Sequence, residues 1–193
     1  QGVLPGETGW VPTYGAPASG LSDGIEDNYG VFRITTLENL SGGGVFGNSW
    51  VNGQDGEFLF GVFHGIDVSA VNPLSATEVN IQSIGGTFDI YLADAYTYDP
   101  TQGIGGYLGD HQNYAGITDQ GYQHFLSFDL IAGIDPLTNA TIDGNFDTGT
   151  DPDSGDAAWF GEITGGDYAY IFDTDGFTTS HGTTADLRGL NDF

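Results

Sequence analysis

The residues with the clearest chemical potential are carboxylates gathered in the stretch TIDGNFDTGTDPDSGD (141–156). Calcium takes about six to eight hard oxygen ligands, and loops rich in Asp and Gly supply both carboxylates and turn carbonyls. Like charges about 4 Å apart repel by roughly 1 kcal/mol even in bulk water, so a bound cation would relieve such a cluster. We therefore expect a structural Ca²⁺ in this stretch. Its candidate ligands are Asp143, Asp147, Asp151, Asp153 and Asp156.

Two other acidic turns, SDGIEDN (22–28) and FDTDGF (172–177), are further candidates for cation binding. Both combine carboxylates with a glycine, which lets the backbone turn sharply around an ion. The alternative for all three stretches is that their acids simply lie in solvated turns. The candidate ligands in these two turns are Asp23, Glu26, Asp27, Asp173 and Asp175.

Signals for catalysis are weak by comparison. The one G-x-S-x-G (20–24) lacks the buried strand and following helix that a nucleophile elbow requires. With 27 acidic residues, no carboxylate pair is singled out as a glycosidase acid and base, although that alternative stays open. The absence of Cys and Lys excludes thiol and Schiff-base chemistry, so we expect no enzyme. The four histidines show no metalloprotease spacing and stand at positions 64, 111, 124 and 181.

The charge balance limits the partners. The formal net charge is -25, and the basic residues are Arg33 and Arg188 alone. Binding phosphates requires Lys and Arg, so nucleic acid and anionic membrane surfaces are excluded, and cations are favoured. Disordered acidic chains have few aromatic residues, whereas 13% of this chain is Phe, Tyr or Trp, so it folds.

Short strands separated by Gly and Asp turns must position these acids. Alternation of apolar and polar residues predicts strands over 29–35, 56–63, 123–131, 140–146 and 157–163, with another over 167–172. We expect 78–93 to form a hairpin that turns at Gly85-Gly86, and 96–122 to be a long loop or crossover. The fold class expected is an all-β, antiparallel, jelly-roll-like β-sandwich over residues 23–193.

Residues 1–22 read as an extended N-terminal arm. They hold three of the seven prolines and show no sustained periodicity, which is also typical of a tail or linker. Their apolar residues instead favour an arm that docks as a donor strand, in this subunit or in a neighbour. The residues expected to dock are Val3, Leu4, Trp10, Val11 and Tyr14.

Several blocks of the chain resemble secreted proteins that carry a PEP-CTERM sorting tail. The likeness begins with GLSDGIEDNYGVFRITTLEN (20–39), in which an acidic segment leads into a strand. It continues through DGEFLFGVFHGIDV (55–68), GGTFDIYLAD (85–94), FDLIAGI (128–134), TIDGNFD (141–147), GEITGGDYAYIFDTDGF (161–177) and TTADLRGLNDF (183–193). The resemblance implies export to the cell surface or extracellular matrix, association with biofilm exopolysaccharide and no assigned catalytic activity. We expect a mature form from which the export signal and the sorting tail have been removed.

Together these observations predict an extracellular structural protein. Natural proteins often protect the edges of a sheet with Lys, and this chain has none, so strand addition between copies is favoured. We expect a homopolymer that forms a surface filament or biofilm matrix. Bound Ca²⁺ is expected to stabilise it. The alternative is a calcium-dependent carbohydrate-binding module, with exposed aromatic rings stacking on sugars. Two sequons that could carry glycans begin at Asn39 and Asn139.

Overall fold

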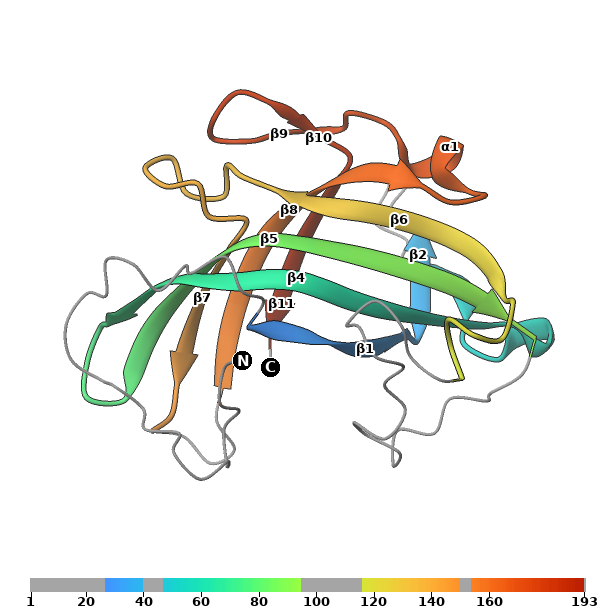
Figure 1. The fold of residues 1–193 in the computed structure, drawn as a ribbon, viewed down its shortest axis with the longest axis horizontal. Helices are drawn as coiled ribbons and strands as arrows, with labels where there is room; N and C mark the ends of the chain where they lie inside the picture. The colour runs from blue at the N-terminus through green and yellow to red at the C-terminus, as the bar shows by residue number, and fades with distance from the viewer. Residues whose placement is uncertain (1–26, 40–46, 95–115, 150–153, 193) are drawn as a thin grey trace.

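The computed structural model describes residues 27–39, 47–94, 116–149 and 154–192, and most of these lie in antiparallel strands (Figure 1). Seven strands form the main sheet. They are β1 (Asn28–Ile34), β4 (Phe58–Pro73), β5 (Glu78–Ala93), β6 (Gln123–Ile131), β7 (Ile142–Asp147), β8 (Ser154–Gly165) and β11 (Leu187–Asp192). The predicted all-β, sandwich-like fold is confirmed.

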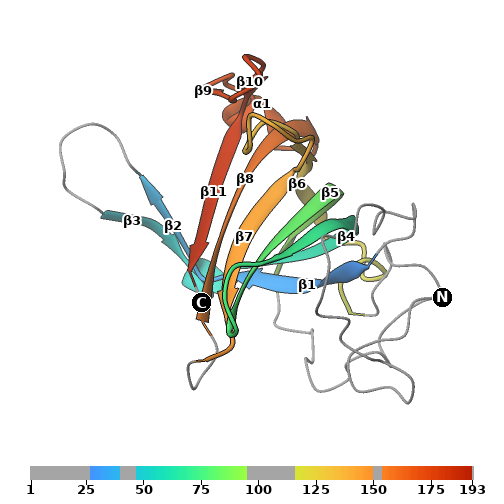
Figure 2. The same ribbon diagram turned by 90° about the vertical axis from the view of Figure 1, so that its left-hand side faces the viewer.

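The strand order of this sheet is β1-β4-β5-β6-β8-β11, and β7 also pairs with β5 and β8. Strands β6 and β7 therefore lie one after the other in the same gap. Residues 87–92 of β5 pair with β6, and residues 78–83 pair with β7. The segment 132–141 between β6 and β7 leaves the sheet and returns to it. Figure 2 shows the strands fanning out from β1 to β11, so the sheet is strongly twisted.

Strands β4 and β5 are each 16 residues long and bend together at glycines. Gly65 on β4 and Gly85 and Gly86 on β5 have φ values of 72°, 70° and 110°, which a glycine adopts without steric cost. The predicted hairpin over 78–93 is therefore wrong. The glycine pair bends one long strand, and the turn lies earlier, where Leu74 and Ser75 donate backbone hydrogen bonds to Glu78.

One face of the sheet, called here the aromatic face, carries a row of rings from neighbouring strands. Phe88 is the centre of this row: its ring centroid lies 5.7 Å from Phe63, 4.8 Å from Phe128 and 6.2 Å from Trp159. Phe128 also belongs to the buried core on this face, which is completed by Leu59, Ile90, Leu126 and Leu130. Their alternation along β5 and β6 matches the pattern in the sequence.

One end of the opposite face is apolar. There Phe60, Val62 and Ala93 are buried together with Ile117, which belongs to the segment 116–122. It is the described part of the stretch 96–122, for which a long loop or crossover is expected, and it consists of turns. Within it, Ile117 is completely buried against the sheet.

Smaller elements lie around the sheet. Strands β2 (Thr36–Asn39) and β3 (Gly47–Val51) pair with each other, as do β9 (Phe177–Thr178) and β10 (Thr184–Ala185). A 3-10 turn, η1, covers Gln54–Gly56. Residues 169–172 form a short helix, α1 (Ala169–Phe172), so the strand predicted over 167–172 is wrong. No helix in the described part of the chain is long and apolar enough to cross a membrane.

Candidate functional site: an acid-lined hollow on the sheet

Beyond the glycine bend, the face opposite the aromatic face is polar. Side chains alternate along a strand, so residues two apart share a face. Strand register places Glu78, Asn80 and Gln82 of β5 opposite Asp147, Asn145 and Asp143 of β7, and Asp156 of β8 lies opposite Asn145. Three neighbouring strands thus present a patch of carboxylates and amides.

Hydrogen bonds join this patch across the strands. Asn80 Nδ2 donates to Asp143 Oδ1 at 2.5 Å and to Asn145 Oδ1 at 3.2 Å. Gln82 Nε2 donates to Asp143 Oδ2 at 3.1 Å and to Asp135 Oδ2 at 3.0 Å. The amides lie between the carboxylates and donate to them, which lowers their mutual repulsion.

Asp135, in the segment 132–141, is held by the same network. The backbone N–H of Leu137, then Gln82 and Thr138, donate hydrogen bonds to its carboxylate and lower its pKa. Hydrogen bonds of this kind favour the charged form. Asp135 therefore links the excursion between β6 and β7 to the polar patch.

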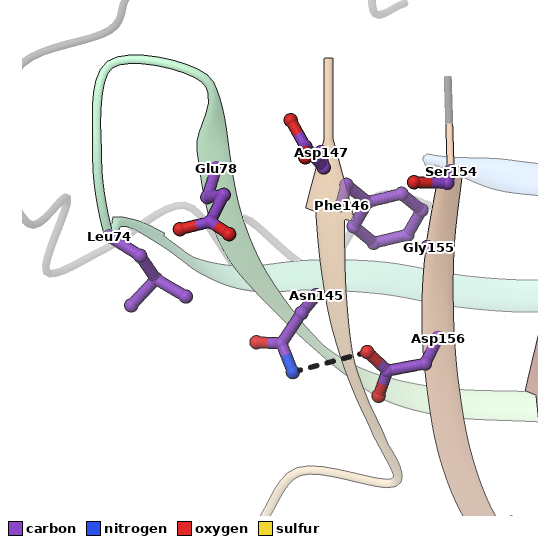
Figure 3. A pocket seen from close by; sticks show the side chains of 8 residues that line it. All are labelled: Leu74, Glu78, Asn145, Phe146, Asp147, Ser154, Gly155 and Asp156. Carbon is purple, nitrogen blue, oxygen red and sulfur yellow. Dashed lines mark hydrogen bonds between the residues drawn. The ribbon is translucent and has the colours of Figure 1, made fainter. Parts of the chain in front are cut away.

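The patch borders an open hollow of about 590 Å³ at the end of β7 and β8 (Figure 3). Its carboxylates belong to Glu78, Asp147 and Asp156, and Asn145 Nδ2 donates to Asp156 Oδ1 at 3.5 Å. The rest of the lining is formed by Leu74, Phe146, Ser154 and Gly155. Because no basic residue lines it, the hollow attracts cations or donors of hydrogen bonds, such as sugar hydroxyls.

The structure brings together only part of the predicted calcium cluster. Asp143, Asp147 and Asp156 lie on one face of β7 and β8. Asp147 also accepts a hydrogen bond from the backbone N–H of Gly149 at 2.7 Å, as expected of a turn acid. Asp151 and Asp153 lie outside the described residues, as do Asp23 and Glu26 and the arm residues Val3, Leu4, Trp10, Val11 and Tyr14.

Other predicted sites lie apart from the hollow. Asp27 accepts a hydrogen bond from the backbone N–H of Val68 at 2.8 Å, at the edge of β4. Asp173 and Asp175 lie after α1, exposed to solvent. Among the sequon residues, Asn139 is exposed in the segment 132–141, and Asn39 ends β2.

Sequence reasoning missed a buried acid, Asp186, which is only 4% exposed. Burial alone would raise its pKa, but the backbone N–H groups of Ile163, Asp175 and Thr174 donate to its carboxylate and bring the pKa below its ordinary value. One of these donors, Asp175, has a φ of 50°, which is uncommon for a non-glycine residue. Asp186 thus holds the acidic turn after α1 in place.

Glu162 on β8 lies near this turn. Its burial, followed by the negative charges of Asp186, Asp175 and Asp173, raises its pKa. Across the sheet it lies opposite Asp129 on β6. The surroundings of Glu162 therefore disfavour its charged form.

A second missed cluster joins two of the scattered histidines. His64 Nε2 lies 3.6 Å from Asp89 Oδ2, and His124 Nε2 lies 3.6 Å from Asp89 Oδ1 and 2.6 Å from Ser127 Oγ. Ser127 donates a hydrogen bond to Asp89, so His124 must donate to Ser127. In a catalytic triad the serine donates to histidine, which bridges serine and aspartate through different nitrogens. Here Nε2 of His124 faces both Ser127 and Asp89, and Ser127 is buried, so the cluster does not have the geometry of that triad.

Within the described residues, no group of three or more His, Asp or Glu side chains is arranged to hold a metal ion. The carboxylates of the hollow surround it without converging on one point. No family model matches the chain, and searches of curated proteins and of solved structures find no match either.

Proposed function

We propose that this protein is an extracellular structural subunit that assembles with copies of itself by adding strands at the edges of its sheet. The observation that carries this proposal is the open sheet. Among the described strands, β1 and β11 each pair on one side only, so two rows of backbone groups face outward. Such edges are templates for pairing with another chain.

The composition of the edges supports the proposal. The only two basic residues of the chain lie one on each edge strand, Arg33 on β1 and Arg188 on β11. Every other charged side chain is acidic or a histidine. In a molecule of net charge -25, this places the only permanent positive charges where a neighbouring acidic copy would approach.

The same net charge sets the conditions of assembly. Copies repel one another over roughly 10 Å at about 0.1 M salt, and the repulsion lengthens as salt is removed. We expect assembly to require salt or divalent cations. The carboxylates of the hollow are hard oxygen ligands of the kind that Ca²⁺ prefers, and a bound ion would neutralise charge there.

The resemblance to PEP-CTERM proteins supports an extracellular location in a surface filament or biofilm matrix. The N-terminal arm is proposed as a donor strand. The described chain begins at Asp27, whose N–H donates to the backbone of Ile66, and the pairing of β1 with β4 ends at Ile66. Among the described strands, residues 69–73 of β4 pair with β5 alone, and we propose this stretch as the acceptor edge for an arm, the chain's own or that of a neighbouring copy.

Sedimentation and negative-stain microscopy of the purified chain test the proposal. We expect filaments or defined oligomers at about 150 mM salt, and their loss at low salt with chelator. Deleting residues 1–22 tests whether the arm is the donor strand. If the shortened chain still folds but no longer forms filaments, the donor role belongs to the arm. A chain that stays monomeric at all concentrations and salt conditions refutes the proposal.

A second candidate function is favoured by the polar patch and its hollow. The planar amides and the carboxylates of the patch are suitable partners for sugar hydroxyls, and a calcium ion could join them. The protein would then be a calcium-dependent carbohydrate-binding module. Binding of a monomeric form to a glycan array, with and without Ca²⁺, distinguishes this function from assembly.

A further inference from the structure

The edge strand β11 has an unusual set of residues facing one side of the sheet. Leu187 packs against the core of the aromatic face, so Arg188 and Leu190 alternate onto the opposite face, and position 192, an aspartate, follows two residues later in the register of β11. Arg188 is exposed, and it makes no ion pair within the described part of the chain. Leu190 is 67% exposed. An exposed leucine thus lies between an arginine and the aspartate at position 192, on a strand that pairs on one side only among the described strands.

We propose that β11 forms a two-fold interface with β11 of a second copy, in antiparallel register centred on Leu190. This inference rests on the proposed assembly through sheet edges and names the surface and its register. Leu190 would lie opposite Leu190 of the second copy. Arg188 of each copy would lie opposite position 192 of the other, where an aspartate stands.

Symmetry limits the registers available. A two-fold axis perpendicular to the sheet keeps the aromatic faces of both copies on the same side. The axis must pass midway between one residue and the same residue of the second copy, because only then do side chains on the same face lie opposite each other. Centring on Gly189 places Arg188 opposite Leu190. Centring on Asn191 leaves Arg188 beyond the paired region. The register centred on Leu190 is the one that gives both arginines an acidic neighbour.

The pairing suits the energetics of an edge. Opposite charges directly across a strand pair are favourable and like charges unfavourable, so this register is selected over its neighbours. Contact between the two leucines removes apolar surface from water. It also extends one sheet across both copies, which satisfies the outward-facing backbone groups of β11.

A β11 contact uses one edge and leaves β1 and the arm for a different contact. An isologous contact closes on itself, so by itself it gives a dimer. A second contact at the opposite edge would link such dimers into an open chain. The building block of the filament is then a dimer.

A single cysteine tests the register, because the chain has no cysteine of its own. Leu190→Cys should form a disulfide-linked dimer on mild oxidation. Leu137→Cys is the control: Leu137 is 91% exposed but lies in the segment 132–141, away from the edge. Equal cross-linking of the two variants would overturn the proposal.

Charge reversal gives an independent test. Arg188→Glu and Asp192→Arg should each weaken dimerisation by about tenfold or more, because each places like charges opposite one another twice. The double variant restores opposite charges and should dimerise like the original chain. Circular dichroism checks that each variant is folded.

The outcomes separate this inference from the proposed function. Suppose that the original chain assembles, but Leu190→Cys does not cross-link and charge reversal does not weaken dimerisation. The β11 register is then wrong, and assembly uses another edge. If the double variant fails to recover, the Arg–Asp pairing is wrong. If the original chain is always monomeric, both proposals fail.

Discussion

The indole ring of Trp159 on β8 lies directly against Gly189 on β11. A Cβ atom built on Gly189 would be 1.9 Å from Trp159 Cε2. The same relationship recurs at the other edge, where a Cβ on Gly61 would be 2.0 Å from the Phe32 ring. Aromatic rings from neighbouring strands therefore cover glycines, and this allows the row of rings on the aromatic face to pack closely.

Gly189→Ala should destabilise the protein because the added methyl group displaces the Trp159 ring. Overpacking of this kind costs about 1–3 kcal/mol. Gly165→Ala is the matched control on β8, since nothing lies within 4 Å of its added Cβ. Urea unfolding followed by tryptophan fluorescence measures both. Equal stability of the two variants would show that the ring moves without cost.

Glu162→Gln should stabilise the protein at neutral pH. The pKa of Glu162 is raised in the folded state, so ionising it costs more there than in the unfolded chain. This destabilisation is present at pH values above the folded pKa and disappears below the unfolded pKa. Since Glu162 is partly exposed, solvent screens the effect, and we expect a gain of a few tenths of a kcal/mol at pH 7.

Thermal unfolding at pH 7 and near pH 4 checks the sign for Glu162→Gln. The exposed Glu57 provides the control substitution, Glu57→Gln, which removes the same charge far from Asp186. A gain that persists unchanged at low pH, or one that Glu57→Gln reproduces, would mean that the local acids are not its cause.

Asp186→Asn should destabilise the protein and loosen the turn after α1. An amide accepts through one oxygen only, so at least one of the three backbone N–H donors would face an NH₂ group. Leaving a buried donor unsatisfied costs about 1–3 kcal/mol. Because the folded pKa of Asp186 is lowered, its stabilising contribution is present above the unfolded pKa and is lost as pH falls through the folded value.

The difference between Asp186→Asn and the original chain should therefore shrink in acid. Hydrogen exchange of the Thr174 and Asp175 amides gives the local measurement. Asp167→Asn is the control, because Asp167 is exposed and accepts one side-chain hydrogen bond, from Gln123. Unchanged exchange at Thr174 and Asp175 would contradict the role of Asp186 in this turn.

The strands were predictable where one face is buried, because apolar residues then alternate with polar ones along the sequence and mark the side that faces the core. Leu126, Phe128 and Leu130 alternate on β6 and all three are buried on the aromatic face. The bend at Gly85-Gly86 was not predictable in this way. A glycine pair can turn a chain or bend it, and the choice depends on β4, whose Gly65 faces the bend from a distant part of the sequence.

The candidate site was predictable only in part for the same reason. The close spacing of Asp143, Asp147 and Asp156 in the sequence predicts that they lie near one another. The register of β7 with β8 places all three on one face. Glu78 joins them only through the pairing of β5 with β7, which local sequence does not encode. Asp186 is buried by contacts made 11 to 23 residues away, so its position depends on the folded sheet.

Calcium should bind at the hollow with a measurable gain in stability. Binding to the folded state alone stabilises by about 2.7 kcal/mol when free ligand is a hundred times its dissociation constant. We expect Ca²⁺ to raise the melting temperature, and the triple variant Glu78→Gln, Asp147→Asn and Asp156→Asn, which removes the carboxylates of the hollow, to abolish this shift.

Removing three negative charges could itself change the melting temperature, so the control variant must remove three as well. Glu57→Gln, Asp119→Asn and Asp167→Asn together do so at exposed positions away from the hollow. If the control variant loses the calcium response equally, then the ion screens net charge and has no defined site there.

Gly85→Ala tests whether the bend in β5 is essential. Gly85 has a φ of 70°, and a Cβ built on it would be 2.4 Å from the backbone oxygen of Gly65. Gly121 has nearly the same φ, 68°, with no atom within 4 Å of its added Cβ. Gly121→Ala should therefore cost only the left-handed strain of about 1–2 kcal/mol. Gly85→Ala should cost clearly more in urea unfolding, because β4 and β5 must also move apart at the bend. Equal costs would mean that the two strands separate freely there, and that the bend does not hold the two halves of the sheet together.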